Sequence, residues 1–275
     1  MITAIQVKEE NNSSLLTLPV GAPTEKSPFF IKYISGLSPV KSEITTTGYA
    51  VSDGAYYQSS YVGTRNIVVV LGYKSSIDPR ASAIVRRDEI YNYFNLKRPI
   101  QLYFVRENNN PDVPNMLKIG ARVESIETEV FSPRDEIQIS LICPDPYFSA
   151  VNPVTYTGKM GERIPTDQLG SAPTGFVLDF TASEEIPYLS ITARYMTTLK
   201  YNKKILAGDR IQISTVTGDK YAYMTRSVFK NRVLDDMVGP MSFALDRGIR
   251  DLFIYPGTRT TQEYKLTFTP KYIGM

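Results

Sequence analysis

The chain has 275 residues, of which 42% are hydrophobic and 21% are charged, a balance typical of a globular protein and not of a disordered one. Its 31 basic and 28 acidic residues are spread along the sequence and leave a formal net charge of +3, so no basic region indicates nucleic-acid binding. The chain contains no histidine, which removes the commonest general base and the commonest zinc ligand. We therefore expect no enzyme and no metal or cofactor site.

The first half of the sequence reads mainly as strands. Its periodic segments combine β-branched or aromatic residues with turn-forming neighbours, which is the pattern of short β-strands. The predicted strands are Ile2–Lys8, Phe29–Ile34, Ile67–Tyr73, Ile100–Val105, Ala121–Phe131 and Glu136–Cys143.

One helix is predicted in this half, from about Pro79 to Leu96. Its apolar residues recur at helical spacing at Ala83, Ile84, Ile90, Tyr91 and Phe94. Arg86 and Arg87 lie on the polar side of this pattern. They are either an anion or partner site or, as is commoner, the solvated face of a helix that packs on a sheet.

The segment Tyr49–Val69 is rich in tyrosine and precedes a very apolar strand. Tyrosine and arginine are enriched in protein interfaces, so this segment is either a hairpin whose outer surface binds a protein or a hairpin that closes its own domain. The candidate interface residues are Tyr56, Tyr57, Tyr61, Arg65 and, from the helix, Arg86.

An alternating strand ends at two prolines near the middle of the chain. Pro144 and Pro146 remove two backbone donors, so the strand over Glu136–Cys143 cannot continue as a regular ladder. We predict a boundary here between a domain over residues 1–148 and a second over residues 149–275. Cys143 falls on the apolar face of the strand, which predicts a small buried side chain and not a nucleophile.

The second half returns to short strands about ten residues apart, which predicts a β-sandwich. The predicted strands are Phe176–Thr181, Leu189–Ala193, Arg210–Thr215, Met241–Leu245, Asp251–Tyr255 and Glu263–Thr269. The overall class is therefore mainly β, with one helix. No segment is apolar for the roughly 18 residues of a membrane helix, and the first residues do not resemble a secretory signal, so we expect a soluble protein made in a cytoplasm.

No catalytic constellation can be assembled from the sequence. Phosphate-binding glycine loops and calcium-binding loops are absent. A glycosidase needs only two carboxylates, for which Asp145, Glu162, Asp179 and Asp246 are candidates, but nothing pairs them. Sugar binding without catalysis is the alternative function, because exposed rings on a sandwich stack on sugars; the candidate tyrosines are Tyr188, Tyr195, Tyr201, Tyr221 and Tyr223.

An ordered series of segments resembles one family along nearly the whole chain. The first half contains GAYYQSS and GTRNIVVVLGY from Gly54 to Tyr73, RPIQLYF from Arg98, RVESIE from Arg122 and ISLICPDPYF from Ile139. The second half contains LKYNKKILAGDRIQIST from Leu199, GPMSFALDRGIRDLFIYPG from Gly239 and FTPKYIGM from Phe268. In this order they resemble the distal tail (Dit) proteins of long-tailed, siphovirus-type bacteriophages.

The resemblance implies a structural virion protein at the distal end of the tail, assembled in the host bacterial cytoplasm. It implies an N-terminal belt domain that forms a homohexameric ring, and a C-terminal galectin-like β-sandwich whose last strand can return to the first domain. The implied partners are other copies of the chain, the tail tube protein, a tail-tip hub or fibre protein and a receptor-binding protein, with no cofactor, no membrane and no sequence-specific nucleic acid.

Overall fold

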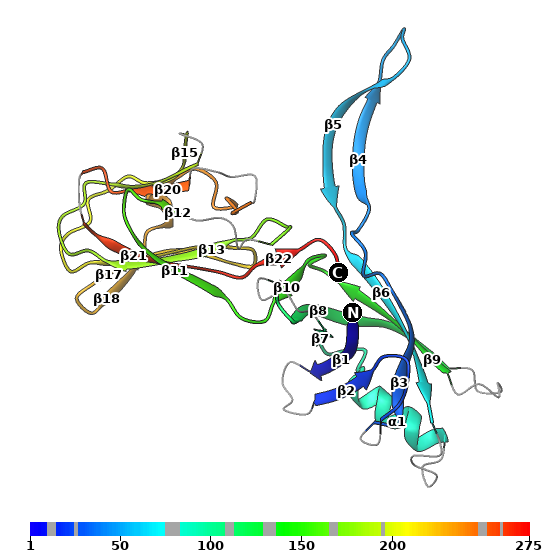
Figure 1. Ribbon diagram of the computed structural model, residues 1–275. Helices are drawn as coiled ribbons and strands as arrows, with labels where there is room; N and C mark the ends of the chain where they lie inside the picture. The colour runs from blue at the N-terminus through cyan, green and yellow to red at the C-terminus, as the bar shows by residue number, and fades with distance from the viewer. Residues whose placement is uncertain are drawn as a thin grey trace. The chain divides into compact units, whose positions relative to one another are not determined.

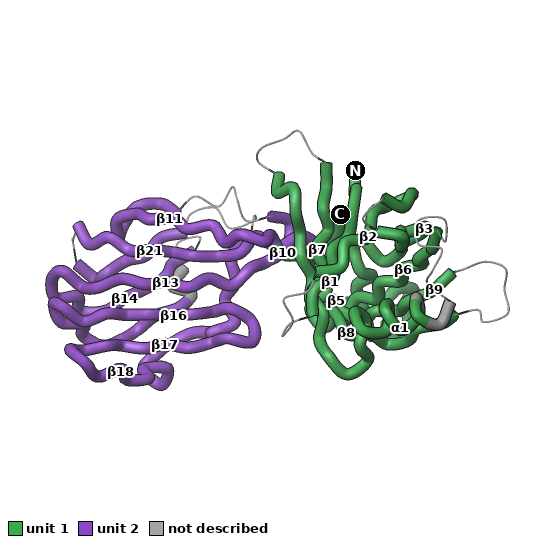
Figure 2. Tube along the Cα trace, turned by 90° about the horizontal axis from the view of Figure 1, so that it is seen from below, with its two compact units in different colours: residues 1–149, 273–275 green, residues 150–272 purple. Residues whose placement is uncertain are grey.

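The computed structural model divides the chain into two compact units, residues 1–149 with 273–275 and residues 150–272 (Figure 2). Both are built mainly from antiparallel strands, which confirms the predicted mainly-β class (Figure 1). The structure describes residues 1–9, 15–24, 27–74, 83–107, 113–128, 136–164, 170–193, 196–246, 252–258 and 261–275.

Unit 1 is organised around one curled sheet with the strand order β2-β1-β7-β8-β9-β6-β3. Its strands alternate buried and exposed residues, as a sheet with one face on a core requires. The bounds are β1 Ile2–Glu9, β2 Leu15–Pro19, β3 Phe29–Ser35, β6 Arg65–Tyr73, β7 Ile100–Arg106, β8 Met116–Thr128, β9 Glu136–Cys143 and the short β10 Phe148–Ala150.

Two features curl this sheet onto itself. The long strand β8 pairs with β7 through its first half and with β9 through its second, with a register shift between Val123 and Ser125. At the opposite side, Val20 and Ile31 form a parallel bridge, and the Gly21 amide donates to the Ile31 carbonyl at 2.9 Å. The inward faces of the strands bury apolar side chains such as Ile5, Phe104 and Ile139.

The helix α1 spans Ala83–Tyr93 and packs against β1. Ile90 and Phe94 are buried as the helical spacing predicts, whereas Tyr91 is partly exposed. The predicted start at Pro79 lies outside the described residues. The side chain of Arg86 also lies outside them, so its predicted interface role stays a prediction.

A second, separate pair of strands extends unit 1 beyond the curled sheet. Strands β4 (Ser42–Gly48) and β5 (Ala55–Val62) form a two-stranded hairpin inserted between β3 and β6, and Figure 1 shows it projecting past both. The turn at its base requires glycine, because Gly36 has a φ of +83° and a Cβ there would lie 1.9 Å from the Asn66 carbonyl oxygen.

Arg65 is a buried cation at the first position of β6, with 1% of the residue exposed. Its guanidinium donates to four backbone carbonyls: Gly36 at 2.5 Å, Ser38 at 2.7 Å, Pro146 at 2.7 Å and Ile273 at 2.7 Å. It also lies over the Phe148 ring, 4.5 Å from the centroid. The sequence predicted Arg65 to be a protein-interface residue. The structure corrects this prediction, because the guanidinium is buried and its N–H groups bond to carbonyls of unit 1.

Unit 2 packs a six-stranded sheet against a five-stranded one. The first has the order β11-β21-β13-β16-β17-β18 and the second the order β12-β20-β14-β15-β19. Their bounds are β11 Val154–Lys159, β12 Arg163–Ile164, β13 Phe176–Thr181, β14 Leu189–Ala193, β15 Met196–Tyr201, β16 Arg210–Val216, β17 Asp219–Arg226, β18 Phe229–Arg232, β19 Met237–Val238, β20 Leu252–Tyr255 and β21 Glu263–Phe268; a 3-10 helix, η1, spans Leu234–Asp236, and β22 (Lys271–Tyr272) precedes the return to unit 1.

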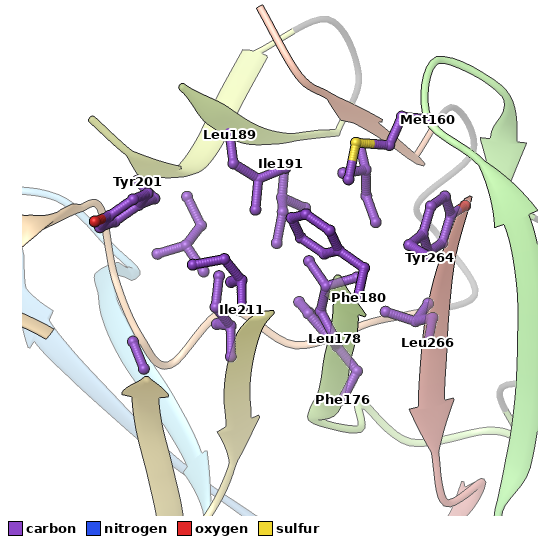
Figure 3. Close-up of a cluster of buried hydrophobic side chains, with 14 of the residues drawn as sticks. Met160, Phe176, Leu178, Phe180, Leu189, Ile191, Tyr201, Ile211, Tyr264 and Leu266 are labelled. Atoms are coloured by element: carbon purple, nitrogen blue, oxygen red, sulfur yellow. The ribbon is translucent and has the colours of Figure 1, made fainter. Parts of the chain in front are cut away.

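One apolar cluster fills the space between these two sheets (Figure 3). Leu178 and Ile211 approach it from the six-stranded sheet, and Ile191 and Ile254 from the five-stranded one. The alternating pattern of unit 2 thus predicts the sandwich correctly. One predicted strand is wrong: Met241–Leu245 forms turns, and only Leu245 makes a bridge, to Thr174.

Cys143 is buried completely, which confirms its prediction as a core residue. Burial raises the pKa of its thiol to about 12, with the nearby Arg65 charge opposing part of this effect. A thiol with such a pKa carries almost no thiolate near neutral pH, so its reactivity is low.

Asp209 lies in the turn before β16, and its carboxylate accepts hydrogen bonds from this turn and from β17. Its residue is 2% exposed, and its carboxylate accepts two bonds from Arg226, at 2.8 and 2.7 Å, and one from the Leu206 amide at 2.9 Å. The bonds from Arg226 are the main reason that the pKa of this carboxyl is lowered. Asp209 therefore ties the turn to the end of β17.

We expect the Arg65→Met variant to be less stable, because four backbone carbonyls lose their donor. Hydrogen bonds to a charged group contribute about 1.5–3 kcal/mol each, so the total loss is at least about 3 kcal/mol and the midpoint of thermal unfolding falls by roughly 6–12 °C. Circular dichroism of heated protein measures this. The matched control is Arg122→Met on β8, where the arginine is exposed. Equal midpoints for the two variants would contradict the assigned role.

We expect Asp209→Asn to lose about 2 kcal/mol at pH 6, because the bonds from Arg226 and Leu206 no longer reach a charged acceptor. The pKa of Asp209 is lowered in the folded state, so the stabilisation is present above the unfolded pKa of about 3.9 and is lost as the pH falls toward the folded value. Urea unfolding at pH 6 and pH 3 should therefore show a gap from wild type that narrows in acid. Asp235→Asn, an exposed carboxyl in η1, serves as the control.

Candidate functional site

The β4–β5 hairpin is the most exposed regular element of unit 1. All eight residues of β5 are exposed, including Tyr56 at 65%, Tyr57 at 55% and Tyr61 at 58%. The two strands pair from Ser42 opposite Val62 to Gly48 opposite Ala55. The hairpin thus carries three of the five predicted interface residues.

One face of the hairpin presents apolar side chains together with hydroxyl groups. Ser42, Ile44 and Thr46 share this face by the two-residue period of β4, and they pair with Val62, Ser60 and Tyr57 in turn. Ile44 is 63% exposed and Val62 is 36% exposed. The Tyr57 hydroxyl lies 2.8 Å from the Ser60 hydroxyl, which places both side chains on this face.

The opposite face is polar. Tyr61 lies across from Glu43 and donates its hydroxyl to the Glu43 carboxylate, and this bond raises the pKa of the tyrosine. Gln58 donates to the Thr47 hydroxyl at 2.5 Å. Tyr56 pairs with Thr47 on this face, so the structure separates Tyr56 and Tyr61 from Tyr57. A register shift between Thr45 and Thr46 accompanies this division.

The hairpin cannot be stabilised by a core of its own. Two strands alone are at best marginally stable in water, and in this one neither face is buried by any described residue. Its exposed aliphatic and tyrosine side chains are of the kinds found in protein interfaces. Chemically, the arrangement can bury apolar area against a partner and donate backbone hydrogen bonds from its free strand edges.

Sequence reasoning missed the first strand of this hairpin. The predicted hairpin lay within Tyr49–Val69, but β4 starts earlier, at Ser42, and contributes Glu43 and Ile44. The run of Ile44 with three threonines after it, followed by the Ser52–Asp53–Gly54 turn, was the available signal.

The tyrosines proposed for sugar binding are dispersed over unit 2. Tyr201 belongs to the core, with 2% exposed, and Tyr195 lies outside the described residues. The Tyr188 ring lies under the Lys200 ammonium, at 4.3 Å from its centroid. Only Tyr221 and Tyr223 lie together, with ring centroids 5.2 Å apart on the outer face of the six-stranded sheet.

The candidate carboxylates are engaged locally. Asp179 accepts two bonds from Arg210, and this lowers the pKa of its carboxyl. Glu162 accepts from the Lys159 amide, and Asp145 from the Tyr147 amide. Within the ranges that the structure describes, no three acidic or cysteine residues lie close enough to hold a metal ion. No helix in those ranges has the length and apolarity needed to cross a membrane.

Comparisons with known proteins agree with the resemblance in the sequence. Residues 24–112 match the family model described as phage tail protein RIFT-related domain. The crystal structure of the Dit protein of phage SPP1, described as a paradigm of the hub adsorption apparatus in phages infecting Gram-positive bacteria, is similar with a TM-score of 0.66 and 12% identity, covering 97% of this chain and 98% of that one. Two structures of the phage p2 baseplate in its activated conformation, with calcium and with strontium, match at 8% identity and a TM-score of 0.46. They cover 99–100% of both chains. No curated protein sequence matches the chain.

The similarity to SPP1 Dit extends over both compact units, and the match to the tail protein domain covers β3, the exposed hairpin, β6, α1 and β7 of unit 1. At 12% identity the structural similarity establishes the fold. The chain therefore shares the fold of the SPP1 Dit protein, and its residues 24–112 match a phage tail protein RIFT-related domain.

Proposed function

We propose that this protein is a structural subunit of the phage virion that forms a hexameric ring at the distal end of the tail tube and joins the tube to the tail-tip hub or fibre. The observation that carries this proposal is the β4–β5 hairpin, which projects from unit 1 with both faces uncovered. A hairpin without a core gains stability by packing on another subunit.

The hairpin face that carries Ile44, Tyr57 and Val62 suits contact with a second copy of the chain. Ile44, Tyr57 and Val62 offer aliphatic and aromatic surface whose burial against a partner would stabilise an interface, and tyrosine in particular is enriched among the residues that dominate binding energy. The polar face, with Glu43, Gln58 and Tyr61, suits the solvated rim of the same interface. Tyr56 and Tyr61 are thus proposed as rim residues and Tyr57 as an anchor.

The remaining partners follow from this position in the tail. A ring at the end of the tube contacts the tube protein on one side and the hub or fibre protein on the other, and unit 2 is the candidate to hold receptor-binding machinery. A non-enzymatic role agrees with the local engagement of the candidate carboxylates described above. Assembly takes place in the host bacterial cytoplasm before the virion is released.

We expect the purified full-length protein to form six-fold rings at micromolar concentration. Replacing Ile44 and Tyr57 together by serine should weaken ring assembly at least about tenfold, because two interface anchors are removed. Light scattering across a dilution series measures the mass, and negative-stain electron microscopy shows the symmetry.

Tyr255→Ser is the matched control, since Tyr255 is an exposed tyrosine on β20 of unit 2. The control variant should assemble as the wild type does. A wild-type chain that stays monomeric at high concentration, or a double variant that assembles as tightly as wild type, would count against self-association through the hairpin.

A further inference from the structure

The outer face of the six-stranded sheet in unit 2 is mainly polar, and no described strand of this unit packs on it; Figure 2 shows this sheet in front of the five-stranded one. Its inward residues, such as Leu178 and Ile211, belong to the core, so their neighbours along each strand point outward. The strand registers align one outward residue of each strand in a single row across the sheet. This row is Thr157, Lys265, Asp179, Gln212, Tyr223 and Arg232. With strands about 4.8 Å apart, it is roughly 24 Å long.

Several side chains of this face hold one another in place. Arg210 donates to both oxygens of Asp179, at 2.9 and 2.5 Å, and Gln212 donates to the same carboxylate at 3.2 Å. The Tyr221 and Tyr223 rings pack together, and the Lys230 ammonium lies 4.1 Å from the centre of the Tyr223 ring. Side chains that are already fixed lose little entropy when a ligand binds.

The face carries an excess of positive charge. Its outward positions include five basic residues, Lys159, Arg210, Lys230, Arg232 and Lys265, and three acidic ones, Asp179, Asp219 and Glu263. Asp179 is already paired with Arg210. The edge formed by β17 and β18 therefore presents Lys230 and Arg232 beside two tyrosines, and this charge favours an acidic ligand.

The apolar area, the surplus charge and the hydroxyl groups of this face indicate which class of acidic ligand it suits. In these six fully described strands, the outward aliphatic residues are Val177 and Val216, which is too little apolar surface for the centre of a protein interface. The surplus charge is small for a nucleic acid, which carries one phosphate per about 1.7 Å of duplex. Outward hydroxyls such as Thr155 and Thr267, whose oxygens lie 3.2 Å apart, suit the hydroxyls of sugars.

We propose that the outer face of the six-stranded sheet of unit 2 binds an acidic polysaccharide along the row from Thr157 to Arg232. Lys230 and Arg232 pair with acid groups of the polymer, and the hydroxyls of Tyr221 and Tyr223 donate to its oxygens. A tyrosine hydroxyl is protonated near neutral pH and can donate, and burial raises the pKa of Tyr221 further. This binding activity goes beyond the proposed structural role and does not require the ring.

The test measures binding of the full-length protein to soluble polymers by titration calorimetry. Polygalacturonate and dextran sulfate are the acidic probes, neutral dextran is the uncharged probe, and a single-stranded oligonucleotide represents nucleic acid. We expect binding to at least one acidic polysaccharide, weakening with salt, and little binding to dextran or to the oligonucleotide.

The double variant Lys230→Ser, Arg232→Ser should bind the acidic polysaccharide about tenfold more weakly. Each surface contact to an anion contributes modestly, but two contacts are lost together. Lys203→Ser with Lys204→Ser is the matched control, because it removes two exposed lysines of unit 2 that lie outside this sheet. Tyr223→Phe, which removes one hydroxyl alone, should weaken binding severalfold.

Three results would overturn the proposal: no binding to either acidic polysaccharide, equal weakening by both double variants, or tighter binding of the oligonucleotide. The Ile44→Ser, Tyr57→Ser variant separates this proposal from the ring. It should bind the polysaccharide with an unchanged affinity per chain, even where assembly fails.

Discussion

The buried guanidinium of Arg65 is the interaction on which the geometry of unit 1 depends. It joins the turn after β3, the start of β6, the proline exit after β9 and the returning C-terminal residues through four carbonyl oxygens. Burying an unpaired cation is costly, and carbonyl dipoles with the Phe148 ring replace its hydration here. Burial lowers the pKa of Arg65, but the ordinary pKa of a guanidinium is so high that the group stays charged near neutral pH.

The position of this cluster also sets the base of the hairpin. The carbonyls of Gly36 and Ser38 lie just before β4, and Arg65 lies just after β5, so both ends of the hairpin are fixed to the curled sheet. The base is rigid while the hairpin beyond it lacks a core. A fixed base beneath a hairpin without a core would hold the proposed interface element at a defined place on unit 1.

The two units differ in which strand edges and sheet faces they expose. Unit 1 curls its sheet so that its first and last strands meet at Val20 and Ile31, which leaves the hairpin as its main free strand pair. Unit 2 keeps two open sheets, and its six-stranded sheet turns a polar, cationic face outward. The first arrangement suits contacts between protein subunits, and the second suits a hydrated ligand.

The sequence pattern alone predicted the strands with alternating apolar residues, the buried Cys143, and the buried Ile90 in α1 and Phe94 just after it. The break at Pro144 and Pro146 followed from proline chemistry. These are local properties, since a two- or 3.6-residue period states which side chains share a face. The role of Arg65 was decided by tertiary structure, because one of its acceptors lies 208 residues away. Its place in phase with Ile67 and Val69 was a signal, but charge argued for exposure. The hairpin faces and the cationic row likewise depend on strand register, which is set by pairing between distant segments and not by any one segment.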